Sequence, residues 1–186
     1  GVLFAVALPI LLISSNVRLI VNSTRLYEWD FNRYEIESRP GLSRDELRSA
    51  AAQIRTYFNN DEELLDLRVS FGDGPVPLFR EREILHMRDV KTLMRGVFSA
   101  QLWTVLYALG FVAAGLLVRR TSFLQLLRRS VIYSGIGSAL VVAGVGLAAV
   151  INFDAVFTRF HLISFANDLW LLDPYSDYLL IMFPQG

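Results

Sequence analysis

The sequence contains two histidines, His86 and His161, and these are its best candidates for acid–base chemistry. A neutral imidazole can accept a proton near neutral pH, and an imidazolium can return one. Glu83 and Asp89 lie three residues before and after His86, so on a helix both carboxylates reach its face. A neighbouring carboxylate can fix the tautomer of an imidazole and make it a better base. Taken alone, His86 also fits a buried structural histidine.

Other familiar catalytic groups are missing from the sequence. There is no cysteine, which excludes disulfides, thiolate metal sites and cysteine nucleophiles. No Gly-x-Ser-x-Gly elbow of a serine hydrolase occurs, and the Gly-Asp-Gly-Pro stretch at 72–75 predicts a turn. A metal-dependent membrane hydrolase with His86, His161 and Asp89 as ligands stays an alternative, although no tight His-Glu-x-x-His spacing supports it. We therefore predict a site without metal or cofactor.

The composition is that of a membrane protein. Of 186 residues, 53% are hydrophobic and only 19% are charged, and the mean hydropathy is +0.40. Soluble domains carry about 25% charged residues. The formal net charge is zero, so no overall field attracts nucleic acid. These values exclude a disordered chain, a nucleic-acid binder and an ordinary cytosolic enzyme.

Three stretches are long and apolar enough to cross a bilayer, which needs about 20 apolar residues. They are residues 1–21, 97–118 and 131–151, and the last two contain no charge. A removed signal peptide is the alternative for the first stretch, but it has no basic start. The third stretch is rich in glycine and alanine, which favours close packing of helices in lipid. We predict a transmembrane helix bundle.

The charges between these stretches predict the orientation. Residues 119–130 form a short basic loop with four arginines and no acid, which is typical of the cytoplasmic side. Residues 22–96 and 152–186 then face outward. Because the chain begins at Gly1 without a methionine and three spans leave its end outside, we expect a fragment in which a fourth helix follows Gly186.

Residues 22–96 carry most of the charge and predict a small extracytoplasmic α+β cap. Ser43 and Glu46 form a capping-box pattern that starts a helix ending near Phe58. A second helix begins near residue 81 and can continue into the second span. The other expected elements are a strand at 26–31, a partner strand through Tyr34 and Ile36, and strands at 67–71 and 76–79 joined across 72–74.

The segment 152–186 is rich in aromatic residues, and His161 lies one helical turn after Phe157. Aromatic side chains concentrate at membrane interfaces, but an interfacial belt needs no interleaved asparagine or acid. His86 precedes the second span by about ten residues and His161 follows the third span by about ten. Both flanks are on the same predicted side, so the two histidines can meet where the cap touches the membrane.

Arg18 lies near the outer end of the otherwise apolar first span. The simpler interpretation is that its side chain extends to the interface. The alternative interpretation is that Arg18 positions the substrate, because burying an ionisable residue in a membrane costs free energy and such residues are often functional.

Two segments carry a family resemblance. Residues 78–91 (LFREREILHMRDVK) resemble the outer-domain motif of the bacterial lipoprotein intramolecular transacylases. Residues 160–184, which contain Phe160-His161, Phe165-Ala-Asn167-Asp-Leu-Trp170 and Asp173-Pro174, are similar to that family's second motif. The resemblance covers most of the chain, including the order of the spans and the outer insertion. The chain departs from the family at its end, where the family continues into a fourth helix.

The resemblance implies an acyltransferase of the bacterial cell membrane that acts on diacylated lipoproteins. Such enzymes move the sn-2 acyl chain of the diacylglyceryl group to the amino group of the N-terminal cysteine, giving lyso-form lipoprotein. His86 and His161 would be the catalytic pair, and we predict His161 as the base and His86 as the acid or the oxyanion stabiliser. Asp89 and Glu83 would support and orient the pair. The residues expected to position the substrate are Arg18, Phe157, Phe160, Phe165, Asn167, Trp170 and Asp173.

The expected partners are the lipoprotein substrate and membrane lipids, without nucleic acid, and the sequence leaves the oligomeric state open. A non-catalytic membrane receptor or scaffold is a second alternative, in which the histidines are buried and an apolar patch of the cap binds a partner.

Overall fold

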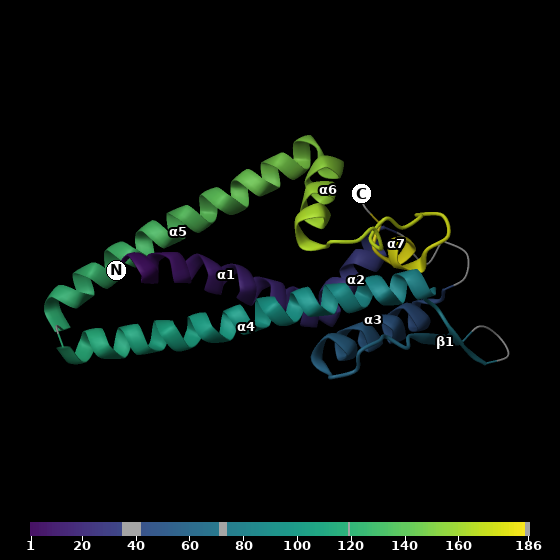
Figure 1. The fold of residues 1–186 in the computed structure, drawn as a ribbon, viewed down its shortest axis with the longest axis horizontal. Helices are drawn as coiled ribbons and strands as arrows, with labels where there is room; N and C mark the ends of the chain where they lie inside the picture. Colours follow the sequence, from purple (N-terminus) through teal and green to yellow (C-terminus); the bar gives the residue numbers. More distant parts are fainter. Residues whose placement is uncertain (35–41, 71–73, 119, 185–186) are drawn as a thin grey trace. The chain divides into compact units, whose positions relative to one another are not determined.

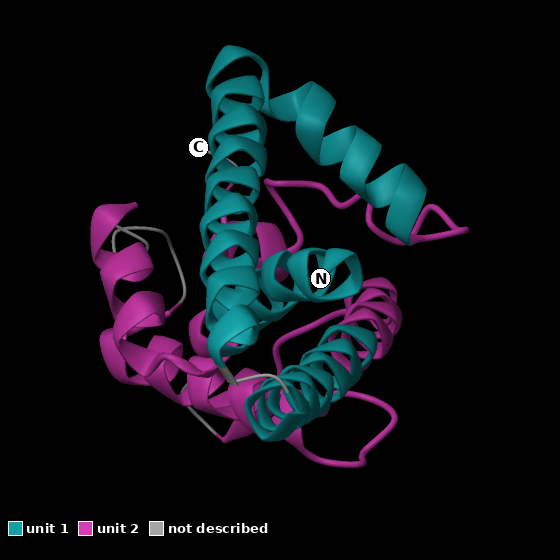
Figure 2. Ribbon diagram, turned by 90° about the vertical axis from the view of Figure 1, so that its left-hand side faces the viewer, with its two compact units in different colours: residues 1–18, 96–164 teal, residues 19–95, 165–186 magenta. Residues whose placement is uncertain are grey.

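The computed structural model describes residues 1–34, 42–70, 74–118 and 120–184. It divides into two compact units, which Figure 2 shows in teal and magenta. Unit 1 comprises residues 1–18 and 96–164, and unit 2 comprises residues 19–95 and 165–186.

Within the described residues, three helices are long and apolar enough to cross a membrane: α1 (Val2–Asn22), α4 (Glu81–Val118) and α5 (Arg120–Ile151). Their apolar side chains are largely exposed, as lipid-facing side chains are. This finding confirms the predicted transmembrane bundle. The 38 residues of α4 extend about 57 Å, well beyond a hydrocarbon core of about 30 Å. Residues 97–118, the predicted second span, are by themselves long enough to cross it.

Aromatic and small residues join the helices of unit 1. The rings of Phe4 in α1 and Phe111 in α4 stack with centroids 4.6 Å apart, and Phe123 of α5 lies 5.4 Å from Phe111. The hydroxyl of Ser134 in α5 donates to the carbonyl oxygen of Ala5 at 2.8 Å. Figure 1 shows α1 running beside α4. Serine at such a contact satisfies its hydroxyl while letting the backbones approach.

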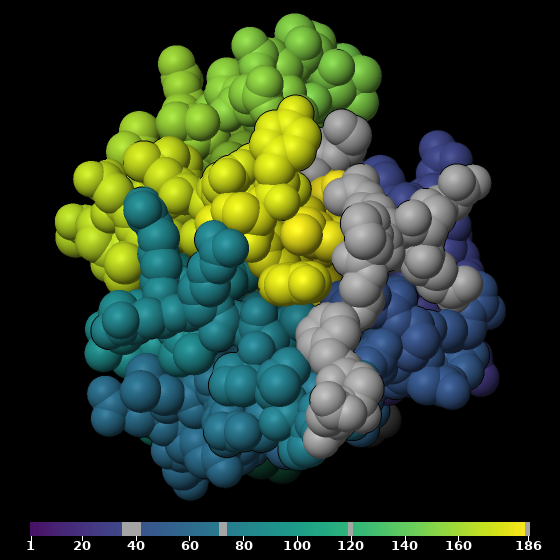
Figure 3. Space-filling model, turned by 90° about the vertical axis from the view of Figure 1, so that its right-hand side faces the viewer, coloured from purple at the N-terminus to yellow at the C-terminus, as the bar shows by residue number. Residues whose placement is uncertain are grey.

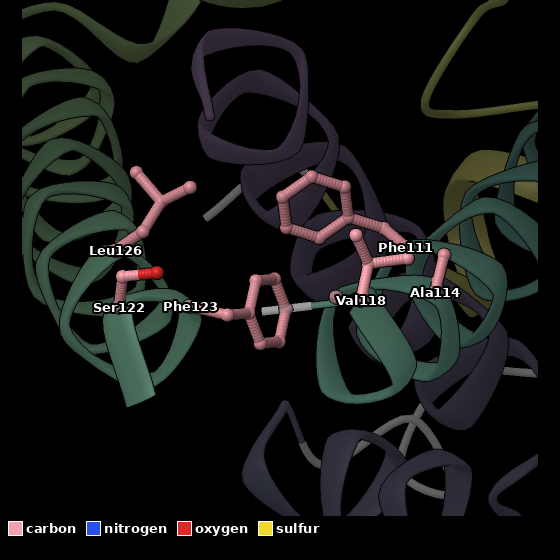
Figure 4. A pocket seen from close by; sticks show the side chains of 7 residues that line it. Phe111, Ala114, Val118, Ser122, Phe123 and Leu126 are labelled. Atoms are coloured by element: carbon pink, nitrogen blue, oxygen red, sulfur yellow. The ribbon is translucent and has the colours of Figure 1, made fainter. Parts of the chain in front are cut away.

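The end of α4 and the start of α5 line an open apolar pocket of about 430 Å³ (Figure 4). Gly115 lies directly against the ring of Phe123, because a Cβ atom at this position would overlap ring carbons. The pocket is lined by Phe111, Ala114, Gly115, Val118, Ser122, Phe123 and Leu126. The lack of a side chain at position 115 is therefore what lets α5 turn back against α4.

The substitution Gly115→Ala is expected to destabilise unit 1 by about 1–3 kcal/mol, because the new methyl group displaces the Phe123 ring. Gly110→Ala is the matched control, since nothing lies within 4 Å of a Cβ atom there. That control should be neutral or slightly stabilising, because alanine is the better helix former. Thermal unfolding in detergent micelles measures both. Adding Phe123→Ala should remove the steric part of the loss, and a Gly115→Ala variant as stable as Gly110→Ala would contradict the packing.

Residues 120–130, expected as a loop, are helical and form the first turns of α5. Residue 119 lies outside the described residues. The segment contains neither glycine nor proline, so nothing in it ends a helix. Basic charge indicates a side of the membrane and does not break a helix, which explains the difference.

The helix α6 (Phe153–Ser164) restarts after a one-residue break at Asn152. The Asn152 side chain accepts a hydrogen bond from the Ala155 N–H at 3.0 Å, which is the geometry of an N-cap. The chain therefore changes direction at this residue, and Figure 1 shows α6 turning away from the line of α5.

Unit 2 is built from α2 (Thr24–Arg33), α3 (Arg44–Asn59), the hairpin β1 (Arg68–Ser70) and β2 (Pro75–Pro77), and the first turns of α4. The strands are antiparallel with Val69 opposite Val76.

The α3 capping box is present, and the helix buries Leu47 and Ile54. The predicted helix, the pairing of the two strands and the continuation of α4 into the second span are confirmed, whereas of the connection expected at 72–74 residues 72 and 73 lie outside the described residues. The core also contains Phe31, Leu42, Ala50, Ala51, Tyr57, Phe58, Leu65, Leu67, Leu78, Phe79, Met87 and Met182.

The strand predicted at 26–31 is wrong, because these residues belong to α2. On a helix Tyr27 and Phe31 share one face, and Phe31 is buried, whereas Trp29 is 63% exposed. An alternation of aromatic and polar residues over only six positions is compatible with a strand and with a helix. The packing of α2 on α3 selects the helix. The partner strand was expected to pass through Tyr34 and Ile36. Tyr34 instead caps the end of α2, and Ile36 lies outside the described residues.

Candidate active site

His86 lies in the first turns of α4 and is buried. Its imidazole meets the ring of Phe165 edge to face, with centroids 5.2 Å apart. Phe165 begins the tail of unit 2, residues 165–184, which continues through α7 (Tyr178–Met182). The structure therefore brings together one residue from each of the two motifs, although 79 positions separate them in the sequence.

The tail is attached to α4 at several successive positions. Arg82 donates to the carbonyl oxygens of Asp168 and Leu169. Arg80 donates to Ser176 at 3.1 Å and pairs with the buried carboxylate of Asp177 at 3.4 Å. Figure 3 shows the yellow tail lying against the teal beginning of α4. Sequence reasoning missed Arg80 and Arg82, although both belong to the 78–91 motif and bracket its helix start.

Glu83 is fully buried, and its carboxylate binds backbone on both sides. One oxygen accepts the Arg80 N–H at 2.8 Å, and the other accepts the Leu179 N–H at 2.7 Å. The first bond caps the start of α4, and the second fixes the tail where α7 begins. In this geometry Glu83 holds the tail against the helix, and the orienting role expected for it toward His86 stays a prediction.

Burial raises the pKa of the Glu83 carboxyl above its ordinary value of 4.5. The N–H donors of Arg80 and Leu179 oppose this rise, and the smaller effects of Asp177 and Arg80 have opposite signs. Because the folded state then binds the proton more tightly than the unfolded state, the stability due to Glu83 is present below 4.5 and falls as the pH rises through the raised pKa.

Wild type and Glu83→Gln are therefore expected to differ in the pH dependence of unfolding. Wild type should lose stability as the pH increases above about 4.5, and Glu83→Gln should lack this contribution. Burial also raises the pKa of Asp30, so the difference between the two proteins isolates Glu83. Chemical denaturation at pH 4 to 8 gives both curves, and parallel curves would contradict the prediction.

Asp89 lies one turn after His86, and its carboxylate accepts a hydrogen bond from the Asn167 side chain at 2.8 Å. The amide oxygen of Asn167 in turn accepts the Leu169 N–H at 3.0 Å. Trp170 is buried, and the carboxylate of Asp173 accepts from the Tyr175 N–H and the Ser176 hydroxyl, both at 3.0 Å. The structure thus shows Asp173 stabilising a turn of the tail, and its predicted contact with substrate stays a prediction.

His161 is buried in unit 1 among the aromatic rings of α6. Its ring lies 4.0 Å from that of Phe157 and 5.2 Å from that of Phe160. The Nδ1 atom is 2.8 Å from the Phe157 carbonyl oxygen. A carbonyl oxygen can only accept a hydrogen bond, so Nδ1 carries the proton and Nε2 holds the lone pair of the neutral ring.

Arg18 is held in unit 1 by contacts with α4. Its Nη1 donates to the amide oxygen of Gln101 at 3.2 Å, and the guanidinium lies 5.0 Å from the centre of the Phe98 ring. The amide nitrogen of Gln101 donates to Ser15 at 3.0 Å. Sequence reasoning missed Gln101 and Ser15, and the signal for Gln101 was a strong hydrogen-bonding side chain within an uncharged span.

Among the residues that the structure describes, no group of three or more histidine, aspartate and glutamate side chains is arranged to hold a metal ion. His86 belongs to unit 2 and His161 to unit 1. The encounter of the two histidines stays a prediction.

The comparisons decide the family. The family model described as lipoprotein intramolecular transacylase Lit matches residues 2–186. The chain belongs to this family. The expected acyltransferase class is thereby confirmed.

Known proteins and structures are similar to this chain over nearly its whole length. An uncharacterized protein of Aquifex aeolicus (strain VF5) is 29% identical over 171 residues, covering 89% of this chain and 72% of that protein. The membrane-integral transacylase Lit from Bacillus cereus has a similar fold, with a TM-score of 0.80 at 19% identity over 99% of this chain and 80% of that one. A variant of that protein with a histidine replaced by alanine gives a TM-score of 0.74 at 19% identity, covering 98% and 77%.

Proposed function

We propose that the chain transfers the sn-2 acyl chain of a diacylated lipoprotein to the amino group of its N-terminal cysteine, with His161 as base and His86 as acid. Family membership over residues 2–186 supports the reaction. The observation that carries the assignment of the base is the hydrogen bond from His161 Nδ1 to the Phe157 carbonyl oxygen. It leaves Nε2 as the basic nitrogen of the neutral ring.

The amino group must lose a proton before it can attack. An α-ammonium has a pKa of about 8, so most of it is protonated near neutral pH. His161 Nε2 takes the first proton from the ammonium and passes it to water, and the neutral amine nitrogen attacks the sn-2 ester carbonyl carbon. A C–N bond forms, and the nitrogen gives its second proton to His161 Nε2. The C–O bond to glycerol breaks, and the departing glyceryl oxygen takes a proton from the His86 imidazolium.

The chain itself limits the separation of the two histidines. Phe165, whose ring meets His86, follows His161 by four residues. Four residues span at most about 14 Å when fully extended. The backbone therefore keeps the Cα atoms of His161 and Phe165 within this distance.

Positioning is the main contribution that this reaction needs from the protein. Nucleophile and ester belong to one substrate molecule, so no acyl-enzyme intermediate is required. Holding two reacting groups in a productive geometry can supply about 7–11 kcal/mol of a barrier. The Phe157 and Phe160 rings beside His161 offer an apolar wall for this purpose, and the Arg18 guanidinium, oriented by Gln101, offers a cation to an ester oxygen.

We place the reaction on the outer surface of the cell membrane. The arginines of 119–130 favour the cytoplasmic side for the junction between α4 and α5. Residues 22–96 and the segment after α5 then lie outside, where lipoproteins are exposed. The single-cysteine variants Glu62→Cys and Gln125→Cys test this topology with a thiol-reactive probe that does not cross the membrane. In intact cells the probe should label the cysteine at position 62, which is outside, and should not label the one at position 125.

The test of function is acyl migration on a synthetic diacylated lipopeptide with a free N-terminus. The full-length protein, reconstituted in lipid vesicles, should convert it to a product of equal mass. Fragmentation in a mass spectrometer should then show one acyl group on the cysteine nitrogen. An N-acetylated lipopeptide, which has no nucleophile, should remain unchanged.

The alternatives give different results in the same assay. A metal-dependent hydrolase would release free fatty acid and lose activity with a chelator, and a receptor or scaffold would bind the lipopeptide unchanged. Either outcome, from protein that melts cooperatively, would contradict the proposed transfer.

A further inference from the structure

We propose that the Asp89 carboxylate, presented by Asn167, binds the α-ammonium group of the lipoprotein substrate. This inference rests on the proposed function and adds a recognition site to it. The site would select lipoproteins with a free, charged N-terminus.

The Asp89 carboxylate lies in a polar, partly open position. Its side chain is 21% exposed, and Asn167 is exposed beside it. Asn167 contributes a neutral amide N–H at 2.8 Å, which orients the carboxylate without cancelling its charge. The carboxylate therefore has the charge and access that an incoming ammonium group needs.

The nearest ion pair of Asp89 is weak. Arg88 Nε lies 3.8 Å from one carboxylate oxygen, and another nitrogen of Arg88 lies 3.8 Å from Glu63. Both distances exceed those of a charge-assisted hydrogen bond, and the Arg88 side chain is 41% exposed. Exposed pairs of this kind contribute little. An ammonium that donates directly to Asp89 would be the stronger partner.

The tail makes the Asp89–Asn167 pair rigid. The Asn167 amide oxygen accepts the Leu169 N–H, and Arg82 donates to the carbonyl oxygens of Asp168 and Leu169. Arg82 and Asp89 are two turns apart on α4, so both ends of this arrangement are fixed to one helix. A carboxylate held in advance binds a small cation at low entropic cost.

The position of Asp89 on α4 places the ammonium next to the proposed acid. Side chains three residues apart on a helix have Cβ atoms about 5–6 Å apart, so an ammonium at Asp89 lies near the His86 ring. After the base removes one proton, the neutral amine can still donate an N–H to Asp89. That bond would direct its lone pair away from the carboxylate and toward the ester.

Binding of an unreactive ligand tests the site separately from catalysis. The probes are a dialkyl ether analogue of the lipopeptide, which has no ester to transfer, and its N-acetylated form. At pH 6.5 the wild-type protein in nanodiscs should bind the free-amine ether about tenfold more tightly than the acetylated one. The preference should decrease as the pH passes the amine pKa of about 8.

Three variants assign this preference. Asp89→Asn should bind both ethers equally, whereas Asp89→Glu should keep part of the preference because it keeps the charge. Asp61→Asn is the matched control, since Asp61 is an exposed acid of unit 2 paired with Arg95, and it should keep the full preference. If Asp89 only oriented His86, acyl transfer would fall in Asp89→Asn while the preference for the free amine remained.

Two results would overturn the inference. One is equal binding of the two ethers by the wild type, and the other is a preference that persists in a folded Asp89→Asn protein. Neither depends on turnover, so a failure of the proposed acyl transfer would be recognised independently in the mass-spectrometric assay.

Discussion

The variant His161→Ala is expected to lose acyl transfer by about 10²–10⁴-fold, because a positioned general base contributes an acceleration of this size. The structure gives the reason in atomic terms. Nδ1 donates to the Phe157 carbonyl oxygen, and Nε2 is the nitrogen that accepts the substrate proton in our proposal. Initial rates on the diacylated lipopeptide, with product fragmentation, measure the loss.

The companion variant His86→Ala should show a loss of similar size, and the pH profiles should differ. Removing the base should abolish the acidic limb of the rate profile, and removing the acid should abolish the alkaline limb. If His161→Ala lost the alkaline limb and His86→Ala lost the acidic limb, His86 would be the base and His161 the acid, and the reaction would be the same. Rates within threefold of wild type in both variants would contradict the two-histidine mechanism.

The variant Glu83→Ala is expected to destabilise unit 2 by about 3 kcal/mol. It removes two hydrogen bonds from backbone N–H groups to a buried carboxylate, and hydrogen bonds to charged groups contribute about 1.5–3 kcal/mol each. The free-energy cost of burying the carboxylate offsets part of what the two hydrogen bonds contribute. The expected loss therefore lies at the lower end of the sum of the two contributions. The loss should release α7 and the tail from α4, because Leu179 would lose its acceptor.

The matched control is Glu81→Ala, which removes an exposed carboxylate from the same turn of α4. It should change the free energy of unfolding by less than about 1 kcal/mol, through the helix dipole alone. Thermal unfolding gives the stabilities, and hydrogen exchange at residues 165–184 reports the release of the tail. Equal protection of the tail in Glu83→Ala and wild type would show that the tail is held by other contacts.

The sequence by itself determined the features that depend on local composition and short spacing. Long apolar stretches indicated the three spans, because a helix of such residues satisfies its backbone hydrogen bonds within the segment itself. Ser43 and Glu46 gave the start of α3, since a capping box requires only residues three apart. The two histidines and their motifs indicated the family, which the match over residues 2–186 confirms.

Short polar elements were harder to predict from the sequence. The alternation of Tyr27, Trp29 and Phe31 fitted a strand, but α2 is a helix because only that geometry packs Phe31 into the core while leaving Trp29 exposed. Residues 120–130 look like a loop by charge and fold as a helix by propensity. In both cases local patterns were compatible with two structures, and packing or continuity selected one.

Only the tertiary structure decided what each candidate side chain contacts. Glu83 lies one turn from His86 in the sequence pattern, yet its oxygens bind the backbone N–H groups of Arg80 and Leu179. Asp89 meets Asn167, and His86 meets Phe165, across more than 75 positions. Helical spacing defines which face a residue occupies but cannot name the segment that packs there. That partner is determined by long-range burial, which brings the tail of unit 2 onto the first turns of α4.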